Sequence, residues 1–456
     1  MNDSRQSSPE LFAHTLDEIK HFVAEALAYG KSLGASEMMV EASDRDGRGV
    51  SVRRRVLDTI QLSHDKRIGV TVYDGKRHGN ASTGDFSIAA IRRTVAAAYD
   101  IARYTSEDAF SGLPEAELLE TSPQNLELFH AWDLPAAEAI ALAARVEQAA
   151  FAADSRVGNS SGASVSSRHV QRVLGMSNGF IEGFAYSSHS IGCGAIAGAG
   201  DDMHKGVWAS QQIDYRKLDT PECVGARAGE RAAAHVGARK LATCKVPVLF
   251  ESTQAIGLLG SYVGATSGMA LYRRTSFLNE SLGKQVFADH VQIVDDPTIP
   301  GAFGSSPFDG EGVRTARRQV VEDGAVGGYF LGSYSARALG MRTTGNAGGP
   351  HNLTLSSSRT TTDDDLQGML RRMGTGLFVT ELMGQGVNGL TGDYSRGAAG
   401  FWVEDGVIRY PVHGITIAGS LQQMFRDVEA VGNDVYIGGG LRSGSVLIKE
   451  MMVAGR

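Results

Sequence analysis

The sequence predicts an α+β protein with an N-terminal two-layer region, in which helices lie on an antiparallel sheet, and a β-rich C-terminal domain. Amphipathic helical segments alternate with runs of alternating apolar residues in the first half of the chain. Tight-turn signals such as Asn178-Gly179 separate several of these runs. Glycine is also abundant, at 57 of 456 residues. Excess glycine without low complexity favours turns and bulges, and therefore sheets.

The first predicted domain covers residues 1–105. A helix is expected over 10–33, where apolar residues recur every three or four positions, and Gly34 ends it. Strand-like runs follow at 37–42, 50–54, 59–63 and 68–73. A turn at Asp74-Gly75 and a second amphipathic helix over 87–104 complete a compact two-layer unit.

Residues 106–123, which contain Pro114 and Pro123, have the composition of a linker. A middle α+β region is expected over 124–236. Its predicted elements are a helix over 135–153, a hairpin that joins 170–176 to 180–186, and a helix over 221–235 that is capped by Thr220.

The C-terminal domain is expected over 237–456. It begins with a buried strand at 245–250 and continues as mostly β structure with short helices. Asp405-Gly406 is typical of a hairpin turn between 400–404 and 407–410. A short amphipathic helix is expected over 421–428.

Composition weighs against several classes of function. The net charge of -7 does not favour nucleic-acid binding, because non-specific affinity for DNA comes mainly from Lys and Arg on phosphates. Three cysteines without a C-x-x-C spacing, Cys193, Cys223 and Cys244, indicate neither a disulfide framework nor a zinc ribbon. We see no signal-peptide pattern and no run of about 18 apolar residues. A cytoplasmic protein that does not enter the membrane is therefore expected.

No segment has the ligand spacing of a catalytic zinc site. The twelve histidines are scattered, and the motif His-Glu-x-x-His does not occur. His351 and His413 stand in the glycine-rich C-terminal half, where a hydrogen-bonded structural role is the simpler interpretation. The run from Gly392 to Gly397 misses the spacing of a serine nucleophile elbow, so Asp393, Ser395 and Arg396 indicate a hydrogen-bonded turn rather than a triad.

The run 373–397 is dense in glycine. Gly384 to Gly389 formally matches G-x-G-x-x-G, but the residues that follow are poor helix formers, which favours a tight β connection over a dinucleotide site. Glycines such as Gly384 and Gly386 could let an extended peptide pair with the sheet. They could equally serve turns and bulges alone.

A set of collinear motifs runs through nearly the whole chain. The C-terminal motifs are Phe308–Thr315, Gly332–Arg337, Gly345–Gly349, Met373–Gly376, Glu381–Gly386 and Thr391–Gly397. Further motifs stand at Gly69–Tyr73, Asp100–Ser106 and Leu282–Gln285. Together they resemble the TldD/PmbA metalloprotease family, and within it the PmbA type, which is also called TldE.

The resemblance implies a cytoplasmic protease of two related subunits that acts on unfolded or short peptides, including peptide-antibiotic precursors and an antitoxin. In the TldD type, a His-Glu-x-x-x-His helix and a distant cysteine hold the metal. Here Leu259 and Gly264 occupy the histidine positions, Gly260 the glutamate position and Ser443 the cysteine position. The resemblance thus implies the metal-free subunit type, with no cofactor of its own and with zinc in a TldD-type partner. The family's older label, modulator of DNA gyrase, finds no support in the charge.

The leading hypothesis is a metal-free subunit that pairs with a TldD-type partner and shapes a peptide cleft, for which we single out His351, Gly384, Gly386, Asp393, Ser395 and Arg396. An alternative is a stand-alone peptide-binding or scaffold protein, most simply a homodimer, without hydrolytic activity. A third is an autonomous hydrolase that uses Ser395 or His351. An obligate partner surface would bury more than about 2,000 Å², and the sequence does not place it.

Overall fold

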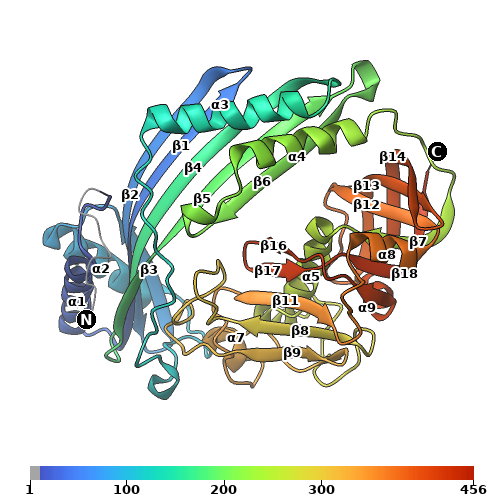
Figure 1. Cartoon of the computed structure of the whole chain (residues 1–456). Coiled ribbons are helices and arrows are strands. Elements are labelled where there is room, and N and C mark those ends of the chain that lie inside the picture. Colours follow the sequence, from blue (N-terminus) through green and yellow to red (C-terminus); the bar gives the residue numbers. More distant parts are fainter. Residues whose placement is uncertain (1–10, 456) are drawn as a thin grey trace. The chain divides into compact units, whose positions relative to one another are not determined.

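The computed structural model describes residues 11–455, and residues 1–10, where the first helix was predicted to start, lie outside the described residues. The chain divides into two compact units (Figure 1). The first comprises residues up to 197 together with 205–232 and 307–315. The second comprises 198–204, 233–306 and 316–456. The α+β class predicted from the sequence is confirmed, because helices cover an antiparallel sheet in the first unit and strands dominate the second.

One six-stranded sheet of long strands forms the first unit, in the order β3-β2-β1-β4-β5-β6. Its strands are β1 Glu37–Arg53, β2 Val56–Asp74, β3 Arg77–Thr83, β4 Val157–Met176, β5 Ile181–Ala197 and β6 His204–Gln212. The Asn178-Gly179 turn joins β4 to β5 as predicted.

The prediction of four short strands between residues 37 and 73 is wrong, because the structure has two long strands there. β1 and β2 pair continuously from Glu37–Tyr73 to Arg53–Val56. Alternation in fact continues through Asp44, Asp46 and Arg48, whose side chains lie on the same face as Val40 and Ala42. Because these positions are polar, the apolar pattern breaks although the strand does not.

Helices of this unit cover the sheet. They are α1 Leu16–Leu33, α2 Ile88–Tyr104, α3 Ala136–Ala153 and α4 Pro221–Ala234, with short helices at Ala116–Leu118 and Tyr215–Lys217. Thr15 and Glu18 form a capping box at the start of α1. A core of Ile19 from α1, Ile91 from α2 and Val40 from β1 then fixes both helices on the sheet.

Two glycines bring α3 and α4 into direct contact. A Cβ at Gly225 or Gly229 of α4 would overlap backbone oxygens of α3, at Val146 and Ala150. Only glycine permits such a close approach of two helix backbones.

The second unit contains two sheets. The first has the order β10-β9-β8-β11-β17-β16, with strands β8 Val291–Asp296, β9 Arg318–Glu322, β10 Ala325–Val326, β11 Asn352–Ser357, β16 Tyr436–Gly438 and β17 Leu441–Ser443. The other has the order β14-β13-β12-β7-β18-β15, with strands β7 Cys244–Phe250, β12 Gly376–Met383, β13 Asp393–Glu404, β14 Val407–Ser420, β15 Val428–Val431 and β18 Val446–Ala454. β14 also pairs with β18, so five of these strands close into a barrel.

Short helices connect these strands: α5 Ser252–Ala265, α6 Gly268–Tyr272, α7 Ser333–Ala338, α8 Leu366–Met373 and α9 Leu421–Arg426, with a single turn at Gly200–Asp202. The predicted helix over 421–428 ends at Arg426 because Val428 already belongs to β15. Within residues 11–455, no helix combines the length and the apolar character needed to span a membrane.

Candidate functional site

Helix α5 and strand β17 meet in the second unit, and they carry the positions that the family resemblance singles out (Figure 1). Leu258, Leu259 and Tyr262 bury one side of α5 in the core. Gly257, Gly260 and Gly264 recur at helical spacing along α5. A Cβ built at Gly257 or Gly264 meets no atom within 4 Å, and one built at Gly260 meets only Leu441 Cδ1 of β17, at 3.9 Å. The face of α5 that carries these three glycines therefore has no side chains there, and it borders open space and β17.

The donors at these positions do not fit a metal ion. Leu259 is fully buried and aliphatic, and Gly264 has no side chain. Ser443 is also fully buried, and its Oγ donates a hydrogen bond of 2.8 Å to the carbonyl oxygen of Gly444. Zinc prefers thiolate, imidazole and carboxylate ligands. Among the residues that the structure describes, no group of three or more His, Cys, Asp or Glu side chains could hold a metal ion.

Strand β12, which packs against α5, extends beyond its parallel neighbour. Its register with β13 runs to Met383, whereas its register with β7 ends at Val379. In the described chain, barrel closure pairs β12 and β13 with neighbours on both sides over most of their length, so those stretches offer no edge to a peptide. The segment Glu381–Met383 is the exception, with strand pairing along one edge alone in the described chain.

The glycine-rich loop after β12 folds back on β13. Gly386 accepts a hydrogen bond of 2.7 Å from the backbone N–H of Ser395, and a Cβ at Gly386 would overlap the Ser395 carbonyl oxygen. Gly384 has a φ of 77°, in the left-handed region that favours glycine. The structure therefore brings Gly386 and Ser395 together, and it gives this glycine a steric reason.

The side chains near Ser395 hold the loop. Asp393 Oδ2 accepts a 2.6 Å hydrogen bond from Thr391 Oγ1. Ser395 is exposed on β13, and the half-buried Arg396 follows it. The turn predicted for Asp393, Ser395 and Arg396 is wrong, because all three residues lie in β13 and pair with β14.

His351 belongs to a different, buried cluster at the start of β11. Its backbone N–H donates to Asp295 Oδ1 at 2.7 Å, and its Nδ1 lies 3.3 Å from Asp295 Oδ2. Asn346 donates to the same carboxylate at 2.9 Å. Burial alone would raise the pKa of Asp295, but the hydrogen bonds from His351 and Asn346 hold it below its usual value. His351 is 7% exposed and stabilises this cluster, so the structure gives it a structural environment.

Comparison with known proteins decides the family. Models of the PmbA/TldA metallopeptidase match the chain over residues 40–102 (domain 1), 129–236 (central domain) and 243–455 (C-terminal domain). The chain belongs to the PmbA/TldD metalloprotease family. Metalloprotease PmbA of Escherichia coli O157:H7 is 45% identical over 430 residues, 94% of each chain. The PmbA homologue of Haemophilus influenzae is 40% identical over 450 residues, 99% of each chain.

Solved structures confirm the fold of this PmbA/TldD family member. A protein of Thermotoga maritima described as a candidate modulator of a DNA gyrase superposes with a TM-score of 0.86 at 25% identity, covering 96% of this chain and all of its own. TldE from Thermococcus kodakarensis superposes with a TM-score of 0.82 at 18% identity, covering 95% of this chain and 100% of its own. At 18% identity, the similarity to TldE from Thermococcus kodakarensis concerns the fold alone.

The sequence analysis named Gly260 and Gly264 of α5 but did not predict that these residues and Gly257 share one face of a helix. The signal is present, because Gly257, Gly260 and Gly264 stand at a spacing of three and four residues. Glycine is less favourable than alanine in a helix by about 1 kcal/mol per residue. Because this segment contains three glycines, helix propensity alone does not predict a helix there.

Proposed function

We propose that this chain is the metal-free subunit of a two-subunit TldD/TldE-type peptidase. The proposal rests on the residues where α5 and β17 meet. Leu259, Gly264 and Ser443 occupy the positions at which the TldD type has its metal ligands. Hydrolysis then requires a TldD-type partner that carries zinc. The substrates are unfolded or short peptides, such as peptide-antibiotic precursors or antitoxins.

This chain contributes a surface for an extended peptide. The one-sided segment Glu381–Met383 leaves backbone groups for a further strand beside α5. Helix α5 contacts β12, and Gly257 and Gly264 of α5 border open space, which we infer takes the added strand. Strand addition supplies affinity through main-chain hydrogen bonds and needs no catalytic side chain.

A cytoplasmic location is part of the proposal. Cys193, Cys223 and Cys244 are free thiols in the structure, which is the usual state in a reducing compartment.

The test is peptide hydrolysis by the purified chain, by a homologue from the same organism that carries His-Glu-x-x-x-His, and by their mixture. We expect no turnover and no stoichiometric zinc for the chain alone. The mixture should co-elute as a complex and should cleave an unfolded peptide in a chelator-sensitive reaction. Strong chelator-sensitive cleavage by the chain alone would contradict the proposal.

Two further measurements test the remaining alternatives. If Ser395→Ala or His351→Ala abolished turnover by the isolated, folded chain, an autonomous hydrolase would be favoured. If the chain bound peptide but no metalloprotease subunit, a homodimeric binding protein would be favoured instead.

A further inference from the structure

A second candidate binding site lies on the helix-covered face of the N-terminal sheet. Strand register places side chains of β2, β1 and β4 in rows across this face. The rows are Ile60, Val50 and Val165, then Leu62, Arg48 and Ser167, then His64, Asp46 and His169. The face therefore changes from apolar to polar within two rows.

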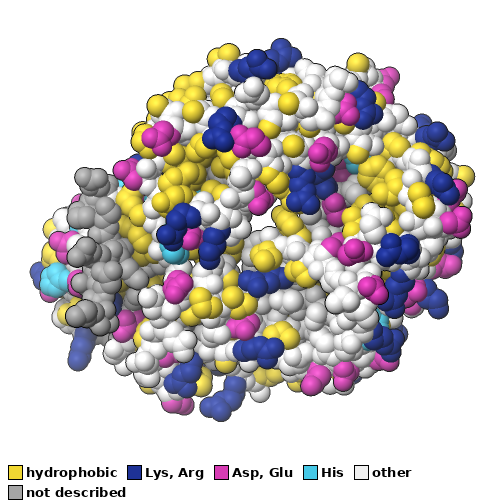
Figure 2. Space-filling model, in the orientation of Figure 1, with side chains coloured by type: hydrophobic (Ala, Val, Ile, Leu, Met, Phe, Trp, Pro, Cys, Tyr) yellow, Lys and Arg dark blue, Asp and Glu magenta, His cyan; other side chains and the backbone are white. Residues whose placement is uncertain are grey.

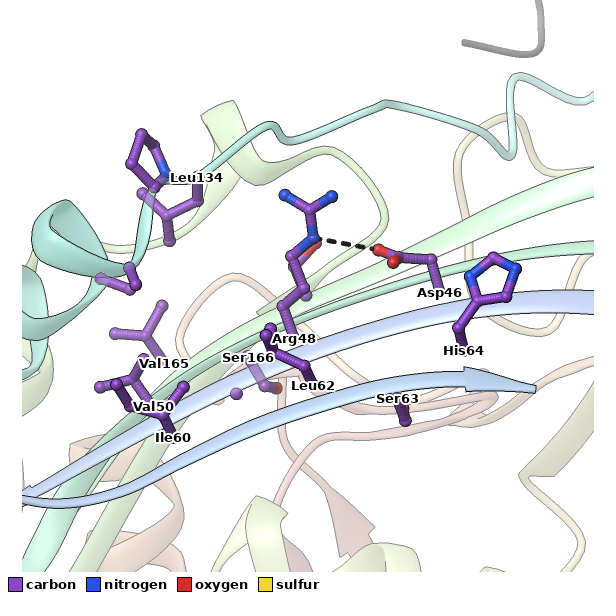
Figure 3. Close-up of a pocket in the computed structure, with 15 residues that line it drawn as sticks. Asp46, Arg48, Val50, Ile60, Leu62, Ser63, His64, Leu134, Val165 and Ser166 are labelled. Atoms are coloured by element: carbon purple, nitrogen blue, oxygen red, sulfur yellow. Dashed lines mark ion pairs between the residues drawn. The ribbon is translucent and has the colours of Figure 1, made fainter. Parts of the chain in front are cut away.

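A cavity of about 480 Å³ lies over these rows. Its walls are Val50, Ile60 and Val165 from the sheet, with Leu134 and Ala139 where α3 begins. Figure 3 shows the aliphatic side chains gathered at one end and Asp46 and His64 at the other. Figure 2 shows hydrophobic side chains gathered where α3 begins. The volume lies in the range of ligand-binding pockets.

The charged groups at the polar end of the cavity are paired with one another. Arg48 Nε lies 3.2 Å from Asp46 Oδ2 and Arg48 Nη1 lies 3.2 Å from Asp133 Oδ1, while His64 Nε2 lies 3.3 Å from Asp44 Oδ1. Behind them, His169 Nε2 accepts the backbone N–H of Trp132 at 3.1 Å, and burial lowers the pKa of His169, so its ring is neutral. An ionised ligand would find no unpaired counter-charge here, and an uncharged one fits.

The cavity opens at a free strand edge. In the described chain, β2 pairs with β1 from residue 56 onward, and β3 joins its other edge only from Ile68. Apolar side chains stand along this unpaired stretch: Val56 is 66% exposed, Ile60 45% and Leu62 74%. Proteins usually shorten, charge or cover such an edge, because it is a template for another strand.

We propose that this edge and cavity bind an extended, uncharged, apolar peptide segment by β-strand addition. The backbone of the segment pairs with residues 56–64 of β2, and alternate side chains enter the cavity beside Ile60 and Leu62. The free edge offers backbone groups that can pair with a peptide backbone. The apolar end of the cavity favours uncharged side chains, and at its polar end the charged groups are already paired. Nine residues of an added strand span roughly 30 Å, at 3.4 Å each. The site belongs to other elements than α5 and β12, and it does not depend on the proposed function.

The test measures binding of a fluorescent, acetylated and amidated nonapeptide of alternating Leu and Thr to the full chain, by fluorescence anisotropy. We expect saturable binding that weakens at least tenfold with Leu62→Lys and severalfold with Ile60→Thr. Val207→Lys is the matched control, since Val207 is 55% exposed on β6 at the opposite edge of the same sheet. It should change the Kd less than twofold. A peptide N-methylated at alternate amides should bind at least tenfold more weakly, because it loses the donors that pair with β2.

Three results would overturn the proposal. One is the absence of saturable binding by the unmodified chain, whose fold is not in question. Another is equal loss with Val207→Lys, or equal affinity of the N-methylated peptide, either of which would indicate apolar adsorption. The third is a dimer in sedimentation velocity that Leu62→Lys dissociates, which would assign the edge to a second copy of the chain.

Discussion

The carboxylate of Glu147 on α3 accepts a hydrogen bond of 2.8 Å from the backbone N–H of Arg54 at the tip of the β1–β2 hairpin. It accepts a second one of 2.7 Å from Arg55. Both arginines have positive φ, 52° and 64°, which is costly for a residue with a Cβ. Glu147 is fully buried, so one side chain holds the strained turn against the helix.

We predict that Glu147→Ala destabilises the protein by about 2 to 4 kcal/mol, because the backbone N–H groups of Arg54 and Arg55 and the buried hydroxyl of Ser160 lose their acceptor. Glu147→Gln keeps one acceptor oxygen and should cost about half as much. Arg55→Gly should instead stabilise slightly, by about 0.5 to 1 kcal/mol, by relieving the left-handed conformation. Urea unfolding measures all three, and an unchanged midpoint for Glu147→Ala would contradict this account.

Gly386→Ala should disorder the loop between β12 and β13. A Cβ there overlaps the Ser395 carbonyl oxygen, so the Ser395–Gly386 hydrogen bond has to break. Gly389→Ala is the control, since its Cβ would meet only the Thr275 oxygen, at 3.9 Å. Amide hydrogen exchange should become faster around Ser395 in the first variant and stay unchanged in the second. Similar exchange in both would show that the close approach is unimportant.

His189 should make stability depend on pH. Burial lowers the pKa of His189 to about 4, and its Nε2–H donates to the His130 carbonyl oxygen at 2.8 Å while Nδ1 accepts from Ser167 Oγ at 3.0 Å. The unfolded chain, with an ordinary histidine pKa near 6.5, binds more protons between pH 6.5 and 4. Stability is therefore full above about pH 6.5 and falls toward pH 4, by about 3 kcal/mol for this group.

His189→Gln should flatten that part of the pH profile, measured by denaturant unfolding from pH 7.5 to 4. The variant will be less stable at neutral pH, but the quantity to compare is the slope of the unfolding free energy against pH. A slope equal to that of the unmodified chain would assign the effect to other groups.

The three thiols should react at distinct rates. Cys223 is exposed, whereas burial raises the pKa of Cys244 and raises that of Cys193 to about 12. Only the thiolate attacks disulfide reagents. At pH 8 an aromatic disulfide reagent should modify one thiol quickly in the native protein and three after denaturation. Cys223→Ser should abolish the fast phase, and a persistent fast phase would show that a buried thiol becomes exposed.

Local signals predicted the helices and hairpins that have clear caps and turns. Gly34 and Asn178-Gly179 each define an element boundary through their own backbone chemistry. Thr15, which caps α1, was missed, and the helix predicted from residue 10 begins at Leu16. Sequence reasoning failed where distant residues decide the structure. Asp46 and Arg48 continue a strand because they pair with each other and with neighbouring strands, which no local pattern records.

The candidate site was only partly accessible from the sequence. The family resemblance pointed to Leu259 and Ser443, and the structure shows that their elements, α5 and β17, meet. It could not show that Gly386 touches Ser395 or that His351 pairs with Asp295, because both contacts depend on tertiary packing. The cavity beside Arg48 was also missed, because the strands and the helix that line it are distant in the sequence and come together only in the folded protein.

Closure of the barrel has a consequence for biosynthesis. The ring is completed when β18, Val446–Ala454, pairs with both β7 and β14, although β7 leaves the ribosome some two hundred residues earlier. Until then β7 has an unfilled side, and its apolar residues are available for wrong pairings. The nascent chain should therefore need protection by a chaperone late in translation, and truncation before residue 446 should yield aggregates rather than a smaller folded protein.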